Sequence, residues 1–231
     1  MTGTTATHTD KEFDEELRTL REALYAMGVR CEQQMTAAMT ALDQRDDAAA
    51  QQVIANDELI DQDEIEIDEL AFRILATRQP VASDLRFIVM ALKFVTDLER
   101  IGDLAGSIAK RGLELSRLPP LGAHVDLHRL SDLVQENLRA ALDSFLTRNA
   151  DRATAVIQAD KEIDRLNAQL FAQLLAHVAA DPSTVTRVLP LTSVCRSLER
   201  IGDHVKNLAE QVVYMVKARD VRHQPTIPPG N

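Results

Sequence analysis

The hexapeptide Leu-Glu-Arg-Ile-Gly-Asp occupies residues 98–103 and returns unchanged at residues 198–203. Chance recurrence of six residues is negligible in a chain of 231 residues. Farther upstream the match continues at an offset of 103, where the Val-Ile pair at residues 53–54 aligns with residues 156–157. A turn between the two blocks can absorb the three-residue difference. The chain is therefore predicted to contain two copies of one unit of about 100 residues.

Each copy is predicted to form three long helices. Gly and Pro contribute only 8 residues each and aromatic residues 3%, a composition that helices tolerate better than sheets do. In the first copy, an apolar stripe with helical spacing runs from Leu17 to Leu42. The next two helices are expected from Asp46 to just before Pro80 and from near Ser83 to Arg111. The second copy predicts helices near residues 125–147, 150–180 and 184–218.

The predicted fold class is all-α, a tandem repeat of two three-helix bundles with six long helices. The first bundle is expected to span residues 10–114 and the second residues 123–219. The run from Leu115 to Gly122 serves as the linker. Residues before about 10 and after about 220 are expected to fray. Pro190 is expected to kink the sixth helix.

Composition excludes several classes of protein. Asp and Glu number 36 against 26 Lys and Arg, so the formal net charge of −10 disfavours binding to nucleic acid. The longest apolar run has six residues, from Phe87 to Leu92, which is too short to span a bilayer. Residues 1–10 are polar and contain no apolar stretch, so a secretory signal is not expected. Cys31 and Cys195 are expected to be core thiols in a reduced, cytoplasmic setting. No catalytic motif is visible, so the chain is not expected to be an enzyme.

Acidic residues lie along the apolar stripes of the second and third helices of each copy. The stripes are placed through Ile54, Phe72 and Leu75 on the second helix, and through Leu85 and Leu92 on the third. Acids spaced i, i+4 fall close to these lines in both copies. The candidate site residues are Asp57, Asp61, Glu99 and Asp103 in the first copy, and Asp160, Asp164, Glu199 and Asp203 in the second.

Four carboxylates crowded at a bundle face need a compensating charge, because desolvation and mutual repulsion both disfavour them. A hard divalent or trivalent cation supplies that charge, since carboxylate oxygens are its preferred ligands. Arg100 and Arg200 are the competing explanation. Gly102 and Gly202 each cost a helix about 0.5–1 kcal/mol. They indicate either a close backbone approach beside a cation or tight helix packing.

Other polar residues near the third and sixth helices are given lesser roles. His204 is expected to be a partly exposed helix residue rather than a ligand. Asn207, one turn beyond Asp203, could extend the second site. Arg86 and Arg187 are expected to form surface ion pairs rather than to bind anions.

At these residues the chain resembles the PhoU family of bacterial phosphate-transport regulatory proteins. The likeness rests on Arg-Gln-Pro-Val-Ala-Ser-Asp-Leu-Arg at residues 78–86, on the hexapeptide that follows, and on Ser-Leu-Glu-Arg-Ile-Gly-Asp-His at residues 197–204. It covers about residues 12–218. The resemblance implies metal sites built from E(D)xxxD motifs, which map onto the same eight carboxylates. Iron, zinc, magnesium and manganese all suit that ligand type.

The resemblance also implies regulation without turnover. PhoU-like proteins couple the ATPase of the phosphate-specific ABC transporter to a phosphate-sensing histidine kinase, and negatively regulate starvation signalling and phosphate uptake when phosphate is plentiful. The chain is therefore expected to be cytoplasmic and to reach the membrane only peripherally, through these partners. A homodimer is expected as well, since Phe94, Leu104 and Ile108 lie off the main stripe of the third helix and suggest surface left to bury.

Two other classes of protein stay open. A ferritin-like dinuclear carboxylate enzyme normally uses Glu-x-x-His, but Gly stands at positions 102 and 202 where that His belongs, which disfavours such an enzyme. A purely structural helical adaptor would use the acids to bind basic partners. Absorption spectra of the iron-loaded protein would reveal the enzyme, and metal analysis after chelation would separate the adaptor from a metal protein.

Overall fold

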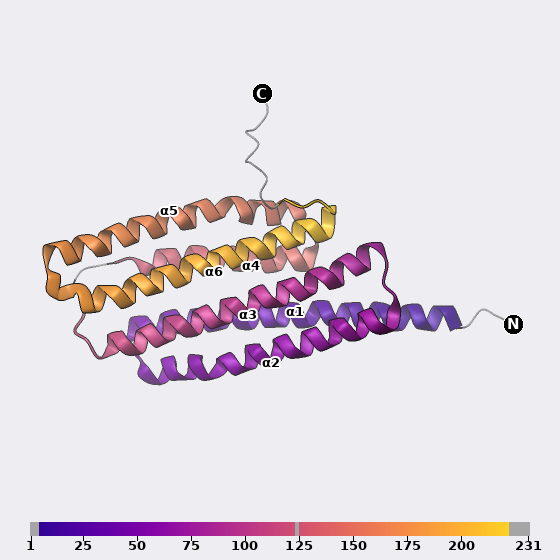
Figure 1. Ribbon diagram of the computed structural model, residues 1–231, viewed down its shortest axis with the longest axis horizontal. Coiled ribbons are helices and arrows are strands. Elements are labelled where there is room, and N and C mark those ends of the chain that lie inside the picture. Colours follow the sequence, from indigo (N-terminus) through magenta and orange to yellow (C-terminus); the bar gives the residue numbers. More distant parts are fainter. Residues whose placement is uncertain (1–4, 123–124, 222–231) are drawn as a thin grey trace, which may run out of the picture.

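The computed structural model describes residues 5–122 and 125–221, and every regular element in those residues is helical. The elements are α1 (Thr5–Gln44), α2 (Asp47–Arg78), α3 (Ala82–Ser116), α4 (Leu127–Thr147), α5 (Ala150–Ala180), the 3-10 turn η1 (Pro182–Thr184) and α6 (Val185–Lys217). Helices α1–α3 form the first bundle and α4–α6 the second (Figure 1). The prediction of an all-α fold with two three-helix bundles is confirmed.

Capping residues explain where the middle helix of each bundle begins. The side chain of Asp46 accepts hydrogen bonds from the second and third backbone amides of α2, and Asn149 does the same for α5. Helix α1 already begins at Thr5, so the expected fraying before residue 10 is wrong for residues 5–10. The region after residue 221 lies outside the described residues. Helix α6 runs through Pro190, and the kink there stays a prediction.

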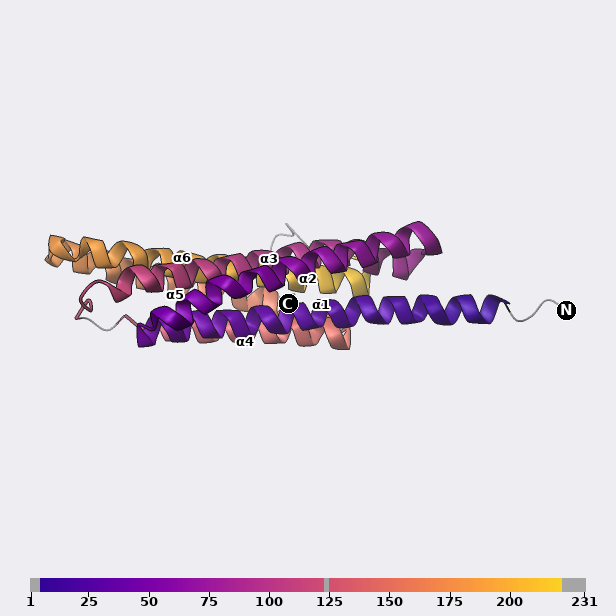
Figure 2. The ribbon, with the colours of Figure 1, turned by 90° about the horizontal axis from the view of Figure 1, so that it is seen from below.

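The two bundles lie side by side and share one core. Helix α3 packs against α6, and α1 packs against α4. Figure 2 shows α1 and α4 beneath α3 and α6, and the colours of Figure 1 show that α3 and α6 run in opposite directions. A Cβ atom on Gly28 of α1 would overlap the side chain of Leu142 on α4, so glycine permits this close approach. Buried apolar residues of both bundles belong to a single hydrophobic cluster.

This side-by-side packing corrects the expected dimer surface. Phe94, Leu104 and Ile108 are only 0%, 6% and 0% exposed, because they are buried within the chain. The ring of Phe94 lies 4.6 Å from that of Phe145 on α4, measured between centroids. Helix α3 contacts α1, α2 and α6, so it needs a wider apolar surface than one stripe. The apolar residues off the stripe therefore pack inside the molecule.

The predicted stripe of α2 is partly wrong. Phe72 is 60% exposed, and the fully buried line consists instead of Val53, Ile60, Ile67 and Ile74, which are seven residues apart. Leu85, assigned to the stripe of α3, is 42% exposed. A heptad line of this kind is typical of helices that pack at a small crossing angle. None of the described helices has the length and apolar character that a membrane crossing requires.

The two cysteines are confirmed as core thiols. Cys31 and Cys195 are 0% and 1% exposed. Burial raises the pKa of both thiols, that of Cys195 to about 12. Thiolate, the reactive form, is therefore scarce at neutral pH.

Candidate functional site

The first carboxylate cluster lies where α2 packs against α3. Its members are Asp57 and Asp61 on α2, and Glu99 and Asp103 on α3. Asp57 is half-buried, and its Oδ1 accepts a hydrogen bond of 3.1 Å from Gln34 Nε2 on α1. The side chains of Glu99 and Asp103 are 14% and 45% exposed. The cluster therefore extends from the bundle interior to the surface.

Burial and mutual repulsion disfavour the ionised forms in this cluster. Burial first, and then Asp103, raises the pKa of Glu99 to about 7. Burial, with Asp103 and Asp61, also raises the pKa of Asp57. Arg100 offers partial compensation, with Nη1 3.0 Å from Asp103 Oδ2 and Nε 3.3 Å from Glu99 Oε2. The contact to Glu99 is not a hydrogen bond, so the buried Oε2 has no hydrogen-bond partner among the described residues.

The second carboxylate cluster repeats the arrangement between α5 and α6, with Asp160 and Asp164 facing Glu199 and Asp203. Asp160 is only 3% exposed. Its Oδ2 accepts a hydrogen bond of 2.7 Å from Lys206 Nζ, whereas its buried Oδ1 has no hydrogen-bond partner in the described chain. Burial, followed by the neighbouring acids, raises the pKa of Glu199 and of Asp203.

The glycines of the repeated hexapeptide bring these helices together. A Cβ atom on Gly102 would lie 2.8 Å from Ile60 Cδ1 and 3.5 Å from Asp57 Oδ1. On Gly202 it would lie 3.2 Å from Ile163 Cδ1 and 3.8 Å from an oxygen of Asp160. The nearest atom in both cases belongs to an apolar side chain. Tight helix packing is therefore the first reason for glycine, and that packing also places an acid against the neighbouring helix.

The eight candidate ligands leave out two acids of the first repeat, Glu64 and Asp68, although the sequence pattern already places Asp68 near the apolar stripe of the second helix. Burial first, followed by Asp68 and Asp61, raises the pKa of Glu64. The buried Oδ1 of Asp68 has no hydrogen-bond partner among the described residues. At the offset of 103, the second repeat has Asn167 and Phe171 in their places. The first cluster is therefore richer in acids.

A further difference concerns the counter-charge. A Cβ atom on Gly106 would lie 3.4 Å from Asp57 Oδ2, and the repeat-equivalent residue is Lys206, which pairs with Asp160. Arg200 makes no ion pair with a described residue, in contrast to Arg100. Among the described residues, the direct ion pair is therefore with an arginine in the first cluster and with a lysine in the second. Aligning the two repeats beyond the hexapeptide would have shown the Gly-to-Lys exchange.

The acids fit a cation by their chemistry more than by their present geometry. Among the described residues, no three His, Cys, Asp or Glu side chains lie close enough together to hold a metal ion. Each cluster nevertheless contains a buried carboxylate oxygen that accepts no hydrogen bond from a described residue, Glu99 Oε2 and Asp160 Oδ1. Oxygens of this kind are the ligands of hard cations. Side chains would have to move to enclose an ion.

Polar residues beyond the second cluster connect the two bundles instead. His204 is half-buried, as expected, and its Nδ1 lies 2.8 Å from Asp97 Oδ1 on α3. Asn207 Nδ2 donates to the same oxygen at 3.1 Å, and Gln211 Nε2 donates to Asp97 Oδ2 at 2.6 Å. Asn207, suggested as an extension of the second site, thus contacts the other bundle through its Nδ2, and a role in the second site stays a prediction.

Comparison with known proteins identifies the family. A family model of the PhoU domain matches residues 24–112 and 127–212, one stretch in each bundle. The chain belongs to the PhoU family. It is 45% identical over 218 residues to the phosphate-specific transport system accessory protein PhoU homolog of Pseudomonas putida, a match that covers 94% of this chain and 85% of that protein.

Other PhoU proteins agree with this assignment. The phosphate-specific transport system accessory protein PhoU of Escherichia coli K12 is 36% identical over 216 residues, covering 94% of this chain and 90% of that protein. The crystal structure of PhoU from Pseudomonas aeruginosa is similar with a TM-score of 0.87 at 42% identity, covering 90% of this chain and 100% of that one. The resemblance and the fold predicted from the sequence are thus both confirmed.

Proposed function

We propose that this chain is an accessory regulator of phosphate transport that acts without catalysing a reaction. In this proposal it couples the ATPase of the phosphate-specific ABC transporter to a phosphate-sensing histidine kinase, and restrains starvation signalling and uptake when phosphate is plentiful. The observation that carries the proposal is 45% identity, over 94% of the chain, to an accessory protein of that transport system. The protein would act in the cytoplasm and reach the membrane only through these partners.

Complementation tests the regulatory role. A bacterial strain that lacks its own PhoU protein should regain repression of a phosphate-starvation reporter in rich phosphate when it expresses this chain. A pull-down from the same phosphate-replete cells should capture the transporter ATPase and the histidine kinase. Failure to restore repression, together with failure to capture either partner, would contradict the proposal.

The proposal extends to metal binding at the two carboxylate clusters. Asp57, Asp61, Glu99 and Asp103 would hold one cation site, and the four equivalent acids of the second bundle the other. The buried oxygens without hydrogen bonds and the raised carboxyl pKa values support a role for positive charge there. A bound cation would supply charge that lets these acids ionise. Iron, zinc, magnesium and manganese are the candidate ions.

Paired substitutions test the metal sites. Glu99→Gln with Asp103→Asn should remove about half of the metal that saturates the protein, because a carboxamide offers only a neutral oxygen. The matching pair Glu199→Gln with Asp203→Asn should remove the other half, and the quadruple variant should bind almost none. Elemental analysis after dialysis measures the metal content.

The matched control replaces exposed acids on α2 and α3, Glu58→Gln with Glu114→Gln, and should keep the full metal content. Full metal in the quadruple variant would refute the site assignment. The reporter strain then separates two roles for the metal. Starvation signalling in rich phosphate would connect the metal to regulation, whereas normal repression would make it structural.

We also infer a homodimer, now through α2 rather than α3. Ile65 and Phe72 are 59% and 60% exposed, and seven residues apart they share one face of α2. Large apolar side chains that meet on one exposed face are typical of protein–protein contacts. They replace the buried residues of α3 on which the sequence-based expectation rested.

A further inference from the structure

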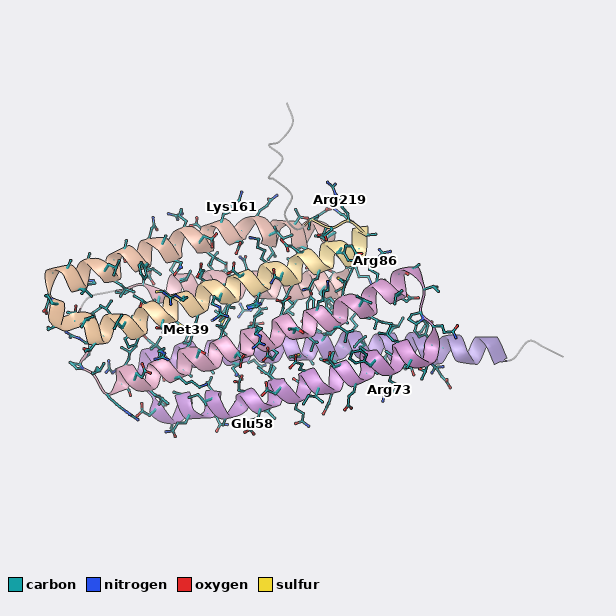
Figure 3. All side chains as sticks on the ribbon, in the orientation of Figure 1. Met39, Glu58, Arg73, Arg86, Lys161 and Arg219 are labelled. Carbon is teal, nitrogen blue, oxygen red and sulfur yellow. The ribbon has the colours of Figure 1, made fainter. Side chains whose placement is uncertain are left out.

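A cavity of about 520 Å³ opens between the two bundles, lined by the beginning of α3 and the end of α6. Figure 3 labels Arg86 where these two helix ends lie beside each other. The cavity has an apolar side that includes Phe87, Phe145 and Val212. Arg21 of α1, Arg86 of α3 and Arg148 after α4 line the same space. We call this space, defined by its three arginines, the arginine cavity.

None of these three guanidinium groups has a carboxylate partner in the described part of the chain. Arg21 lies over the ring of Phe87, 4.8 Å from its centroid. Arg86 Nη1 donates to the backbone oxygen of Met215 at 3.4 Å, so the surface ion pair expected for Arg86 is wrong. The guanidinium of Arg148 makes no hydrogen bond or ion pair with a described residue. Burial and the nearby Arg148 lower the pKa of Arg21, which shows that like charges are held close together.

The remaining charged side chains do not neutralise this cavity. Arg18, which also lines it, pairs with Glu15 and Glu22 outside the lining. The two acids in the lining are Asp84, which accepts a 3.4 Å hydrogen bond from a neighbouring serine, and the exposed Asp14. Positive charge therefore prevails locally in a chain whose net charge is −10. Such a site attracts anions, because its low-dielectric walls concentrate the local field.

The opposite end of the molecule shows what equivalent arginines do when their role is structural. A cavity of about 380 Å³ lies there, lined by the end of α3 and the beginning of α6. Arg45, which corresponds to Arg148 at the offset of 103, donates to the carbonyl oxygens of Leu115 and Leu118. Arg187 donates to a linker carbonyl at 3.1 Å, so its expected ion pair is wrong as well. Those arginines hold the chain beyond α3, whereas Arg148 has no such acceptor among the described residues.

We propose that the arginine cavity binds a phosphate-type oxyanion, as inorganic phosphate or as the phosphate group of a small metabolite. The guanidinium group presents donors in a planar fork that matches phosphate oxygens. The volume of about 520 Å³ lies in the range of small-molecule sites, and the apolar side offers a surface for the body of a phosphate ester. The site shares no residue with the carboxylate clusters, so it stands apart from the proposed metal binding.

Equilibrium dialysis of the full chain with labelled orthophosphate and with labelled ADP tests the proposal. Chelator is included so that a cation held by the carboxylates cannot bind the probes. At least one probe should bind saturably with one site per chain. Arg21→Gln with Arg148→Gln should raise its Kd at least tenfold, roughly the effect of losing charge-assisted hydrogen bonds. If orthophosphate binds, the free ion is a sufficient ligand for the arginine cavity. If only ADP binds, the ligand must be a phosphate ester.

The matched control removes two arginines from the opposite end, Arg45→Gln with Arg187→Gln, and should change the Kd less than about twofold. The proposal is overturned if neither probe binds saturably up to about 10 mM, which is weaker than about −3 kcal/mol. It is equally overturned if the arginine-cavity variant binds as well as the unaltered chain, or if both variants lose affinity alike.

A second measurement uses the unaltered chain and so does not depend on how the variants fold. Phenylglyoxal modifies accessible arginines, and mass spectrometry locates each adduct. The bound probe should protect Arg21 and Arg148 at least fivefold, a change expected from occupancy near saturation. Protection should not extend to Arg45 and Arg187. Equal protection at both ends, or no protection at Arg21 and Arg148, would overturn the proposal.

Discussion

Replacing Glu99 by Gln should stabilise the metal-free protein at pH 8 and leave its stability unchanged at pH 4. Burial, and then Asp103, raises the pKa of Glu99 from the usual 4.5 to about 7. The folded state therefore holds this proton more tightly than the unfolded state does. That contribution to stability is fully present below about pH 4.5 and is lost as the pH rises through about 7. Gln carries no charge at either pH, so it avoids the loss.

The size of the gain follows from the same difference in pKa. Each pKa unit corresponds to about 1.4 kcal/mol, so the step from 4.5 to about 7 sets an upper limit of about 3.5 kcal/mol. The side chain is 14% exposed, and water reaching it reduces this limit. We expect a gain of about 1–2 kcal/mol in the free energy of unfolding at pH 8.

Urea unfolding followed by far-UV circular dichroism, in the presence of chelator, measures this gain at both pH values. The matched control is Glu58→Gln, an exposed acid at the outer side of α2 (Figure 3), and it should show no pH-dependent change. A Glu99→Gln variant that is less stable than the parent at pH 8 would refute the reasoning. An equal gain at both pH values would refute it as well, because the effect would then not come from ionisation.

Three further predictions concern the second cluster, the bundle interface and the oligomer. Lys206→Gln should raise the metal affinity of the second cluster at least tenfold in a competition titration. The positive charge of Lys206, 2.7 Å from Asp160, repels a cation at that site, and the substitution removes it. Unchanged affinity would contradict this prediction. Gly28→Ala should cost about 1–3 kcal/mol of unfolding free energy through overlap with Leu142, and a neutral result would show that the Leu142 side chain moves aside without cost. The molar mass measured by light scattering at micromolar concentration should be about twice 25.6 kDa, and Phe72→Gln should shift this mass toward that of the monomer. A parent chain that stays monomeric would exclude the dimer.

The helices and their pairing into bundles could be predicted because local signals determine them. The repeated hexapeptide identified two equivalent units, and capping residues such as Asp46 marked the helix starts. The carboxylate clusters followed from the i, i+4 spacing of acids, which places side chains on one helix face. The repeat and the helical period thus placed Asp57 and Asp103 on the apolar faces of their helices, and in the structure Asp103 is near enough to raise the pKa of Asp57.

The packing between the bundles could not be predicted, because one apolar stripe does not say how many neighbours a helix has. Phe94 is covered by Phe145, about fifty residues farther along the chain, and no local pattern connects them. The same limit applies to Asp97, whose three partners all come from the other bundle. The arginine cavity escaped notice for the same reason, since its walls come from four separate helices.

The contacts that join the two bundles match each helix with its own repeat equivalent: α3 with α6, and α1 with α4. Contacts of this self-matching kind are those of an isologous homodimer, here fused into one polypeptide. In a homodimer any substitution appears twice, once on each side of the symmetry axis. Fusion releases the halves from this constraint, so Gly106 faces the first cluster while Lys206 enters the second. One polypeptide built from two repeats can thereby carry two carboxylate clusters that differ in charge.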